Sequence, residues 1–406
     1  MVYVTPRTVN SVSFDVVKNA NGDKTRCTGL TEILAAVGKG YHKSPLAVRV
    51  IGCLADTAVG GLKEGAYLSL QGHDEADRRI ENVTIEGIGT DATLYGFGIH
   101  LKRSGNIELR NIAIMLQPDD AVSLEMGNTG TWIHNIDFFY GRPGQDADQV
   151  KGDGSIDIKA RSTDITVDHC HFRDNGKVTG TWGTDSAAAQ PRVTYHHNWF
   201  DHTDSRCPRL LATTAHVYNN YYDGVAVYGI GATEGSSVFA EANCFRNVSR
   251  PMMISGQGTD TYDAKTKAYT RKGTFSGLDG GMIKAYGNRF EGKRPKLVYQ
   301  TDSPAQFDAW LAESRADTVP AAATTVRGGH RYNNFDTAPA MYTYRPDAAA
   351  DVPAIVTARA GRLLGGDFQW TFDNAADDQR HDINAGLKQA LLSYRPSLLR
   401  VQHPRR

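Results

Sequence analysis

The stretch Val193-Thr-Tyr-His-His-Asn-Trp-Phe200 is one copy of a short unit that recurs along the chain. Val167-Asp-His-Cys-His-Phe172, Val217-Tyr-Asn-Asn-Tyr-Tyr222 and Phe239-Ala-Glu-Ala-Asn-Cys-Phe245 share its order of apolar residues, then Asn or His, then an aromatic residue. Recurrence every roughly 22 residues, with insertions of variable length, is typical of stacked coils with loops on one side. An immunoglobulin-like sandwich does not repeat one motif in this way. The sequence therefore predicts an all-β solenoid, whose units end at Ile114, Phe138, Phe172, Phe200, Tyr222, Phe245 and Phe290.

Each unit carries Asn or His shortly before its final apolar residue. Asn tolerates the left-handed conformation that a tight turn needs, and its amide can hydrogen-bond to its counterpart on the next coil. These residues are therefore predicted to form a structural ladder, and His196 and His197 are assigned to structure rather than to a metal site. The members of the predicted ladder are Asn111, Asn135, His169, His197, Asn198, Asn219, Asn220, Asn243 and Asn288.

The two ends of a solenoid expose apolar surface and need caps. Thr31–Val37 begins with Thr and has helical apolar spacing, which predicts a helix over the N-terminal end. Asp382–Tyr394 is amphipathic and is expected to be a helix that packs back on the coils. Gln306–Arg315 is predicted to be a further short helix, and Gly256–Gly281 a long exposed loop between coils.

We expect one elongated domain over residues 1–406, with an N-terminal cap over about residues 1–50 and a C-terminal extension over about residues 330–406. The 45 basic and 45 acidic side chains balance, so no overall field attracts nucleic acid or a membrane surface. No apolar run approaches the length of a membrane span. We therefore expect neither nucleic acid nor a membrane as partner, and a monomeric protein.

The first residues lack a basic start followed by an apolar stretch, so no signal peptide is visible. The chain is expected to be either cytosolic or the mature form of a secreted or periplasmic protein. Its five cysteines, Cys27, Cys53, Cys170, Cys207 and Cys244, are scattered without a Cys-x-x-Cys pair, which excludes a zinc ribbon. One or two disulfides and five buried free thiols both remain open.

Asp153-Gly-Ser-Ile-Asp157 is the first of the candidate functional motifs. On a straight strand its two carboxylates share a face but lie roughly 13 Å apart. Calcium needs its oxygen ligands at about 2.3–2.6 Å, so both can bind one ion only if the chain bends, as Gly154 allows. Asp120 is expected to supply a third carboxylate from the preceding coil, and Asp119 is its competitor. The alternative is that these are solvated surface acids.

Lys177 and Arg206 follow the acidic motif at intervals close to one coil each. Because adjacent strands lie about 4.8 Å apart, side chains at matching places on successive coils would form a basic edge beside the acidic one. Pro208 stiffens the segment that carries Arg206 and Arg209. An all-oxygen site favours calcium over softer metals. The alternative for a lone arginine is an ordinary surface charge.

These positions together resemble the pectate lyases of polysaccharide lyase family 1, and the likeness runs from about Val83 to Phe245. Members of that family are right-handed parallel β-helices, so the resemblance implies this fold. It also implies Ca²⁺ as cofactor and polygalacturonate (demethylated pectin) as substrate. By the same resemblance Asp120, Asp153 and Asp157 are calcium ligands, Lys177 binds substrate, and Arg206 is the catalytic base.

The chain departs from the family pattern at two places. Trp132-Ile-His-Asn135 stands where the family commonly has Trp-Ile-Asp-His, an element that supports the fold more than the chemistry. The family's Arg-x-Pro-x-x-Arg motif would end at Leu211, so the second arginine is missing. Arg209, two residues earlier, points to the same side of a strand as Leu211 and is therefore the candidate for the substrate-binding contact that the missing arginine would make.

The chemistry implied by the resemblance is β-elimination in a uronate polymer, which gives 4,5-unsaturated oligogalacturonides. The base removes the C5 proton, and calcium and Lys177 stabilise the charge that develops on the carboxylate. An arginine acts as a base only where neighbouring cations disfavour its charged form. The alternatives are a hydrolase that uses Asp153 and Asp157 as acid and base, a pectin lyase without calcium, and a non-catalytic β-helix such as a carbohydrate-binding adhesin.

Overall fold

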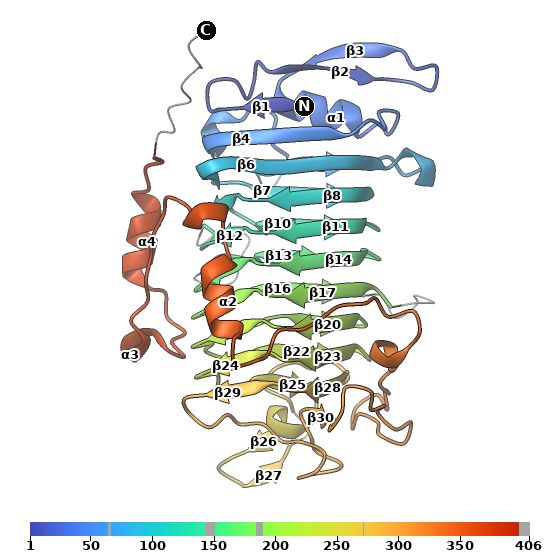
Figure 1. The fold of residues 1–406 in the computed structure, drawn as a ribbon, viewed down its shortest axis with the longest axis vertical. Helices are drawn as coiled ribbons and strands as arrows, with labels where there is room; N and C mark the ends of the chain where they lie inside the picture. Colours follow the sequence, from blue (N-terminus) through green and yellow to red (C-terminus); the bar gives the residue numbers. More distant parts are fainter. Residues whose placement is uncertain (64–65, 143–150, 184–189, 271, 398–406) are drawn as a thin grey trace.

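The chain of this computed structural model winds into a parallel β-helix, drawn as a stack of coils in Figure 1. The predicted solenoid is therefore confirmed. The structure describes residues 1–63, 66–142, 151–183, 190–270 and 272–397. The last residues of the expected C-terminal extension, 398–406, lie outside these ranges.

Each complete coil contributes three short strands, and strands at the same place on successive coils pair in parallel. The first series forms a separate sheet, which carries the candidate site. Its strands are β5 (Tyr67–Gln71), β7 (Gly98–Lys102), β10 (Val122–Glu125), β13 (Ile156–Ile158), β16 (Thr179–Trp182), β19 (Arg209–Leu211), β22 (Ile230–Thr233) and β25 (Met252–Ile254).

The second and third series join into one larger sheet, because the long strand β6 pairs with members of both. The second series is β1 (Val2–Val4), β4 (Leu46–Ala55), β6 (Ile80–Tyr95), β8 (Ser104–Arg110), β11 (Thr129–His134), β14 (Thr163–Asp168), β17 (Arg192–His196), β20 (Thr214–Tyr218), β23 (Ser237–Glu241), β28 (Met282–Tyr286) and β30 (Trp310–Leu311). The third series is β9 (Ala113–Met115), β12 (Asp137–Phe138), β15 (His171–Arg173), β18 (Trp199–Asp201), β21 (Tyr221–Asp223), β24 (Cys244–Arg246) and β29 (Arg289–Glu291).

The final apolar residues of the repeated units stack inside the coils. The strand register pairs each of them with the next, as the alignment of the units predicts. The Phe138, Phe172 and Phe200 rings lie nearly parallel, with centroids 4.9 and 5.2 Å apart. Tyr222 and Phe245 continue the stack at 4.8 and 4.3 Å. These rings are buried, so the aromatic column is a main source of the hydrophobic stabilisation of the coils.

The predicted ladder is confirmed at one turn. Asn198, Asn220, Asn243 and Asn288 follow one another on successive coils. The side-chain oxygens of the last three each accept hydrogen bonds of 2.9–3.0 Å from the preceding asparagine. The other predicted asparagines, at neighbouring positions of the turns, do not hydrogen-bond to the amide on the next coil in this way, because they face the C-terminal extension. Asn111, Asn135 and Asn219 have positive φ, and each hydrogen-bonds to backbone of that extension.

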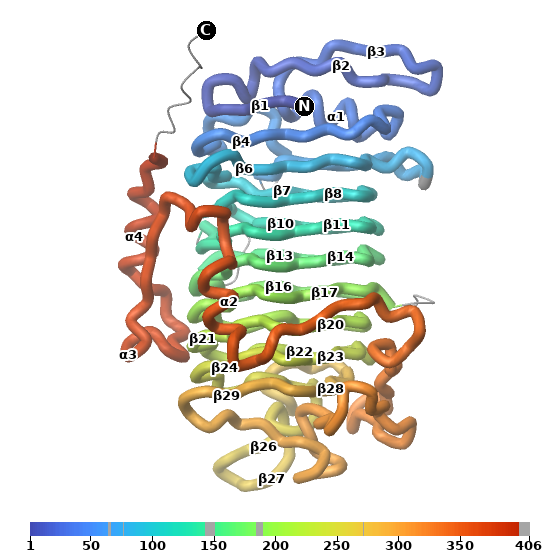
Figure 2. Tube along the Cα trace, viewed as in Figure 1, coloured from blue at the N-terminus to red at the C-terminus, as the bar shows by residue number. Residues whose placement is uncertain are grey.

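The N-terminal end is covered as predicted by the helix α1 (Leu30–Val37), whose buried face is Leu30, Ile33, Leu34 and Val37. A hairpin of β2 (Ser13–Val17) and β3 (Lys24–Thr28) packs beside it, at the blue end of the tube in Figure 2.

The C-terminal extension returns along the outside of the coils, as Figures 1 and 2 both show in red. Its helices are α2 (Val352–Arg359), α3 (Asn374–Asp377) and α4 (Ala385–Leu392). α4 confirms the helix predicted within Asp382–Tyr394. Leu387 and Leu391 of α4 pack in one apolar cluster with Phe139 and Tyr140 of the coils.

The helix predicted over Gln306–Arg315 is wrong. This segment instead contains β30, which pairs with the edge strand β28. An unpaired sheet edge offers backbone hydrogen bonds that outweigh local helical preference. The loop expected over Gly256–Gly281 is present, but it contains a short hairpin, β26 (Tyr262–Asp263) and β27 (Ala268–Tyr269), and its first residues are buried.

All five cysteines lie among the described residues and are free thiols. The sequence left open either one or two disulfides or five free thiols, and the structure has the free thiols. Among the described residues, no helix is long and apolar enough to cross a membrane.

Candidate active site

The sequence-predicted residues gather at the sheet formed by β5 to β25 and at the turns that enter its strands. The register of this sheet places Asp157 of β13 opposite Gly180 of β16, and Gly180 opposite Arg209 of β19. Gly180 has no side chain, and the ring of Trp182 lies over it instead. One strand, β16, thus lies between the strand of the acidic motif and the strand of the arginine motif, and Gly180 has no side chain that would separate them.

Four carboxylates converge where the chain enters β13. Asp119, Asp120 and Asp153 each place an oxygen within 4.8 Å of the others. The Asp157 carboxylate lies near that of Asp120, on either side of Gly154. A Cβ atom added to Gly154 would lie 2.7 Å from Asp120 Oδ1 and 2.9 Å from Asp157 Oδ1. The structure thus brings the predicted Asp120 and Asp153 together with the competitor Asp119, while the predicted Asp157 lies beside them, outside this group of three.

Lys159 lies between two of these carboxylates. Its Nζ is 3.0 Å from Asp120 Oδ2 and 3.3 Å from Asp157 Oδ2. Burial raises the pKa of Asp157 to about 6, although Lys159 opposes the shift. Burial and the charge of Asp157 also raise the pKa of Asp120. The pKa of Lys159 is raised because the attraction of the two carboxylates exceeds the effect of its own burial. This cluster therefore attracts positive charge strongly.

Lys177 lies on the coil that follows the acidic motif. Its Nζ is 3.4 Å from Asp153 Oδ1, and its backbone forms a parallel bridge with Ser205. The bridge places Lys177 directly beside the residue that precedes Arg206. The structure thus confirms the coil-by-coil spacing of the acidic motif, Lys177 and Arg206.

Arg206 occupies a strained turn. It has φ of 59°, in the left-handed region, and its carbonyl accepts a 2.7 Å hydrogen bond from Thr179 N. Non-glycine residues in this region cost free energy and are often found at functional sites. The Arg206 guanidinium lies 5.9 Å from the Trp182 ring centroid, and the peptide bond before Pro208 is cis.

Arg209 extends from β19 into a pocket of about 590 Å³. Leu210 points into the coil, so Arg209 and Leu211 share the outer side of the strand, as predicted. Arg209 Nη2 donates to Ser276 Oγ at 3.2 Å, and its guanidinium lies 5.7 Å from the Phe275 ring. Burial lowers the pKa of Arg209.

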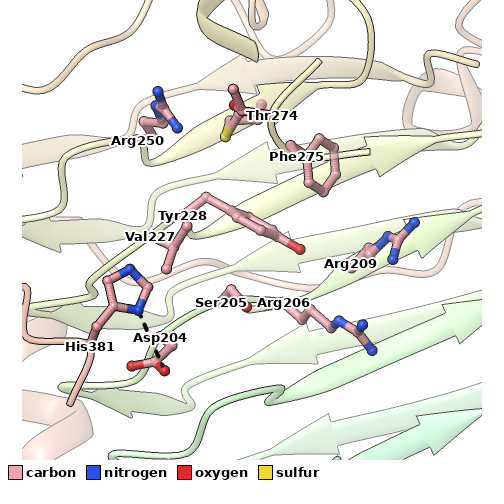
Figure 3. A pocket seen from close by; sticks show the side chains of 11 residues that line it. Asp204, Ser205, Arg206, Arg209, Val227, Tyr228, Arg250, Thr274, Phe275 and His381 are labelled. Atoms are coloured by element: carbon pink, nitrogen blue, oxygen red, sulfur yellow. Dashed lines mark ion pairs between the residues drawn. The ribbon is translucent and has the colours of Figure 1, made fainter. Parts of the chain in front are cut away.

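Figure 3 shows the side chains around this pocket, with Arg206 and Arg209 both extending away from His381. Arg250 and Tyr228 from the next coils line the pocket, and Phe275 from the loop Gly256–Gly281 reaches it. Three arginines and two aromatic rings therefore line the pocket, which suits an anionic ligand.

Sequence reasoning identified the acidic motif, Lys177, Arg206 and Arg209 but assigned no role to several other residues. Lys159 had a usable signal, because it lies two positions after Asp157 on a strand and so shares its face. Phe275 and His381 had none, since they reach the pocket from distant segments, and Arg250 lies just before β25, on a coil beyond the candidate motifs.

The donor set fits calcium. Carboxylate oxygens are the ligands that this ion prefers, and Gly154 leaves open the space between Asp120 and Asp157 that a larger residue would fill. Asp119, Asp120 and Asp153 already lie close enough to share one ion after small side-chain movements. Lys159, which contacts Asp120 and Asp157, would have to shift for Asp157 to join them.

Comparison with known proteins points to one family. A family model described as pectate lyase matches residues 50–277. A pectate trisaccharide-lyase of Bacillus licheniformis is 27% identical over 235 residues, which cover 57% of this chain and 65% of that protein. Pectate lyase A of Emericella nidulans is 31% identical over 211 residues, which cover 49% of this chain and 62% of that protein. The matches thus span less than two thirds of these relatives.

Solved structures show the same fold. A pectate lyase from a Bacillus species, in complex with trigalacturonate, superposes with a TM-score of 0.59 at 22% identity and covers 82% of this chain and 90% of its own. Pectate lyase II of Xanthomonas campestris superposes with a TM-score of 0.52 at 20% identity, with 81% and 97% covered. At these identities the likeness carries the fold alone.

Proposed function

We propose that this chain, which belongs to the pectate lyase family, cleaves α-1,4-linked polygalacturonate by calcium-dependent β-elimination. The observation that carries this proposal is the order of groups on successive coils: a carboxylate cluster, then Lys177 beside Asp153, then Arg206. A polyanionic sugar laid along the coils would meet these groups in turn.

Arg206 is proposed to act as the base. It removes the C5 proton of a uronate residue, the C5–H electron pair becomes the C4–C5 double bond, and the bond from C4 to the glycosidic oxygen breaks. Water protonates the departing oxygen, so no second protein acid is required. Lys177 and Arg209 are proposed to bind substrate carboxylates, Lys177 at the reacting sugar and Arg209 farther along the pocket.

Asp120, Asp153 and Asp157 are proposed to hold calcium, with Asp119 close enough to join them. When bound, calcium neutralises the carboxylate next to C5 and makes that proton more acidic. The carboxylates must be ionised to bind it. Because burial raises the pKa of Asp157 to about 6, activity should fall as the pH drops through this value.

Polygalacturonate is too large and too charged to cross a lipid membrane unaided, so we propose that the protein acts outside the cytoplasm. We propose further that it acts as a monomer and as one elongated domain, since the acidic and basic groups all come from one chain.

The test is to incubate the protein with polygalacturonate, with and without a calcium chelator, and to follow the ultraviolet absorbance of the unsaturated product. We expect absorbance only with calcium, and loss of at least about 100-fold in kcat for Arg206→Lys. Asp164→Asn changes an exposed carboxylate on β14 and serves as the control that keeps full activity.

Other outcomes identify the alternatives. New reducing ends without ultraviolet absorbance would indicate a hydrolase with paired carboxylates. Absorbance on methyl-esterified polymer that persists with chelator would indicate a pectin lyase. No cleavage of either polymer by the folded protein would indicate a carbohydrate-binding β-helix.

A further inference from the structure

A second group of metal-ligating side chains lies on the other sheet, away from the carboxylate cluster. Asp168 ends β14, His169 follows it, and His196 ends the neighbouring strand β17. The register pairs Asp168 directly with His196. One ligand atom from each of these residues lies within 4.8 Å of the others.

The contacts within this group orient the rings. His169 Nδ1 lies 2.6 Å from Asp168 Oδ2, and the Trp132 indole donates a hydrogen bond to the same carboxylate. His196 Nδ1 lies 2.9 Å from Nδ1 of His197, so one of these two nitrogens carries the shared proton. The other nitrogen of His197 is 2.9 Å from Asp347 of the C-terminal extension.

We propose that Asp168, His169 and His196 form a binding site for a transition-metal ion such as Zn²⁺. Imidazole nitrogens with one carboxylate suit zinc, copper and nickel, whereas calcium prefers oxygen ligands. Ligand atoms around one tetrahedral zinc lie roughly 3.3 Å apart. The three ligand atoms lie within 4.8 Å of one another. Side-chain rotations that shorten these distances by about 1.5 Å at most would therefore bring them to the spacing of a zinc site.

The state of the ligands suits metal binding. Burial lowers the pKa of His196 to about 3, so this imidazole is neutral near neutral pH, and neutral imidazole is the form that binds metals. Burial raises the pKa of Asp168, but the side-chain hydrogen bonds from His169 and Trp132 help to bring it below its usual value.

The group is also accessible. Asp168 and His169 line a hollow of about 610 Å³ between the sheet and the segment Thr357–Gly365 of the C-terminal extension. An ion can therefore reach the ligands without opening of the coils. Binding would connect β14 to β17 and, through His197 and Asp347, fix the extension against the coils. We expect it to stabilise the folded protein rather than to take part in catalysis.

The test is titration of chelator-treated, dialysed protein with Zn²⁺, followed by calorimetry and by metal analysis after gel filtration. We expect one equivalent of zinc and a rise of about 2 °C or more in Tm at saturating zinc. Co²⁺ in place of zinc should give visible absorbance bands of a site with nitrogen ligands. His196→Gln and His169→Gln should each weaken zinc affinity at least about tenfold.

Three matched variants make the result specific. His73→Gln removes a half-exposed imidazole elsewhere and should leave zinc affinity unchanged. Asp153→Asn should lose calcium binding and keep zinc binding, whereas His196→Gln should do the reverse. His169→Gln alters a partly exposed ring, so circular dichroism can verify that it folds. The proposal is overturned if the wild type takes up no zinc, or if the folded His169→Gln protein binds it as tightly as the wild type.

Discussion

Gly154 is the residue on which the shape of the carboxylate cluster depends. It lies in the bend between Asp153 and Asp157, and its missing side chain leaves room for two carboxylate oxygens. We predict that Gly154→Ala pushes Asp120 and Asp157 out of position, because the new methyl group would lie under 3.0 Å from both. Calcium affinity and kcat/KM on polygalacturonate should each fall at least about tenfold.

The control for this change is Gly277→Ala, where an added Cβ meets nothing within 4 Å. Both variants should keep the circular dichroism spectrum of the wild type. Unchanged calcium affinity in Gly154→Ala would show that the ion, if it binds, lies elsewhere.

Arg209 is the candidate for the missing second arginine of the family motif. It reaches the pocket from the same side of β19 as Leu211, and Ser276 and Phe275 hold its guanidinium. We predict that Arg209→Ala raises KM for polygalacturonate more than it lowers kcat, because a contact made equally in the ground and transition states is lost. Leu211→Arg should partly restore KM in that background. Steady-state kinetics that show no change in KM would leave Arg209 without a role in substrate binding.

Among single residues, the sequence intervals correctly predicted that the acidic motif, Lys177 and Arg206 lie on neighbouring coils, since each interval is close to the length of one coil. The contacts of Lys159 with both Asp120 and Asp157 could not be predicted from spacing, because they depend on the bend at Gly154. His381 and Phe275 come from segments whose path the repeat does not determine.

Among the elements, the asparagine ladder is the feature that the sequence predicts best, and its energetic weight can be measured. Asn220 is fully buried, and its amide donates to Tyr195 O at 2.9 Å and to Asn243 Oδ1 at 3.0 Å, while its oxygen accepts from Asn198. We predict that Asn220→Ala lowers the free energy of unfolding by about 3 kcal/mol or more, because several buried partners lose their hydrogen bonds.

Asn106→Ala provides the matched control. Asn106 donates a similar amide hydrogen bond, of 2.7 Å to Asn82 Oδ1, but it lies at an exposed position of β8. Its replacement should cost only about 1 kcal/mol, most of it because its φ of 50° suits Asn better than Ala. Equal shifts in the denaturation midpoints of the two variants would show that the buried ladder stabilises the fold no more than an exposed hydrogen bond does.

Elements within the repeat were predictable because each buries the same kind of residue at the same place. The segment Gln306–Arg315 was not, because its local pattern is helical while its conformation is decided by the free edge of β28. The turn asparagines show a similar limit. Asn135 and Asn219 were correctly expected at tight turns, but their partners belong to a C-terminal extension whose course no periodicity reveals.

For the whole molecule, the decisive long-range contact ties this extension to the coils. Arg362 Nε donates to Asp137 Oδ2 at 2.8 Å, and Arg173 Nη1 donates to Asp137 Oδ1 at 2.7 Å. Asp137 and Arg362 are almost completely buried, at 1% and 0% side-chain exposure. Removing one partner of a buried ion pair leaves the other charge uncompensated, so Asp137→Asn should cost about 3–5 kcal/mol of stability.

The same carboxylate makes a defined contribution to acid stability. Although burial opposes it, the attraction of Arg173 and Arg362 lowers the pKa of Asp137 to about 2. Because this value lies below that of an unfolded aspartate, the contribution of about 2 kcal/mol is present above roughly pH 4 and is lost as the pH falls toward 2. Thermal denaturation of the wild type and Asp137→Asn should therefore differ most above pH 4 and converge toward pH 2. Asp15→Asn, which removes an exposed partner of Arg26, should follow the wild-type curve throughout. If the Tm difference between Asp137→Asn and the wild type stayed constant from pH 6 to about pH 2, the buried pair would not be the group that couples the extension to acid stability.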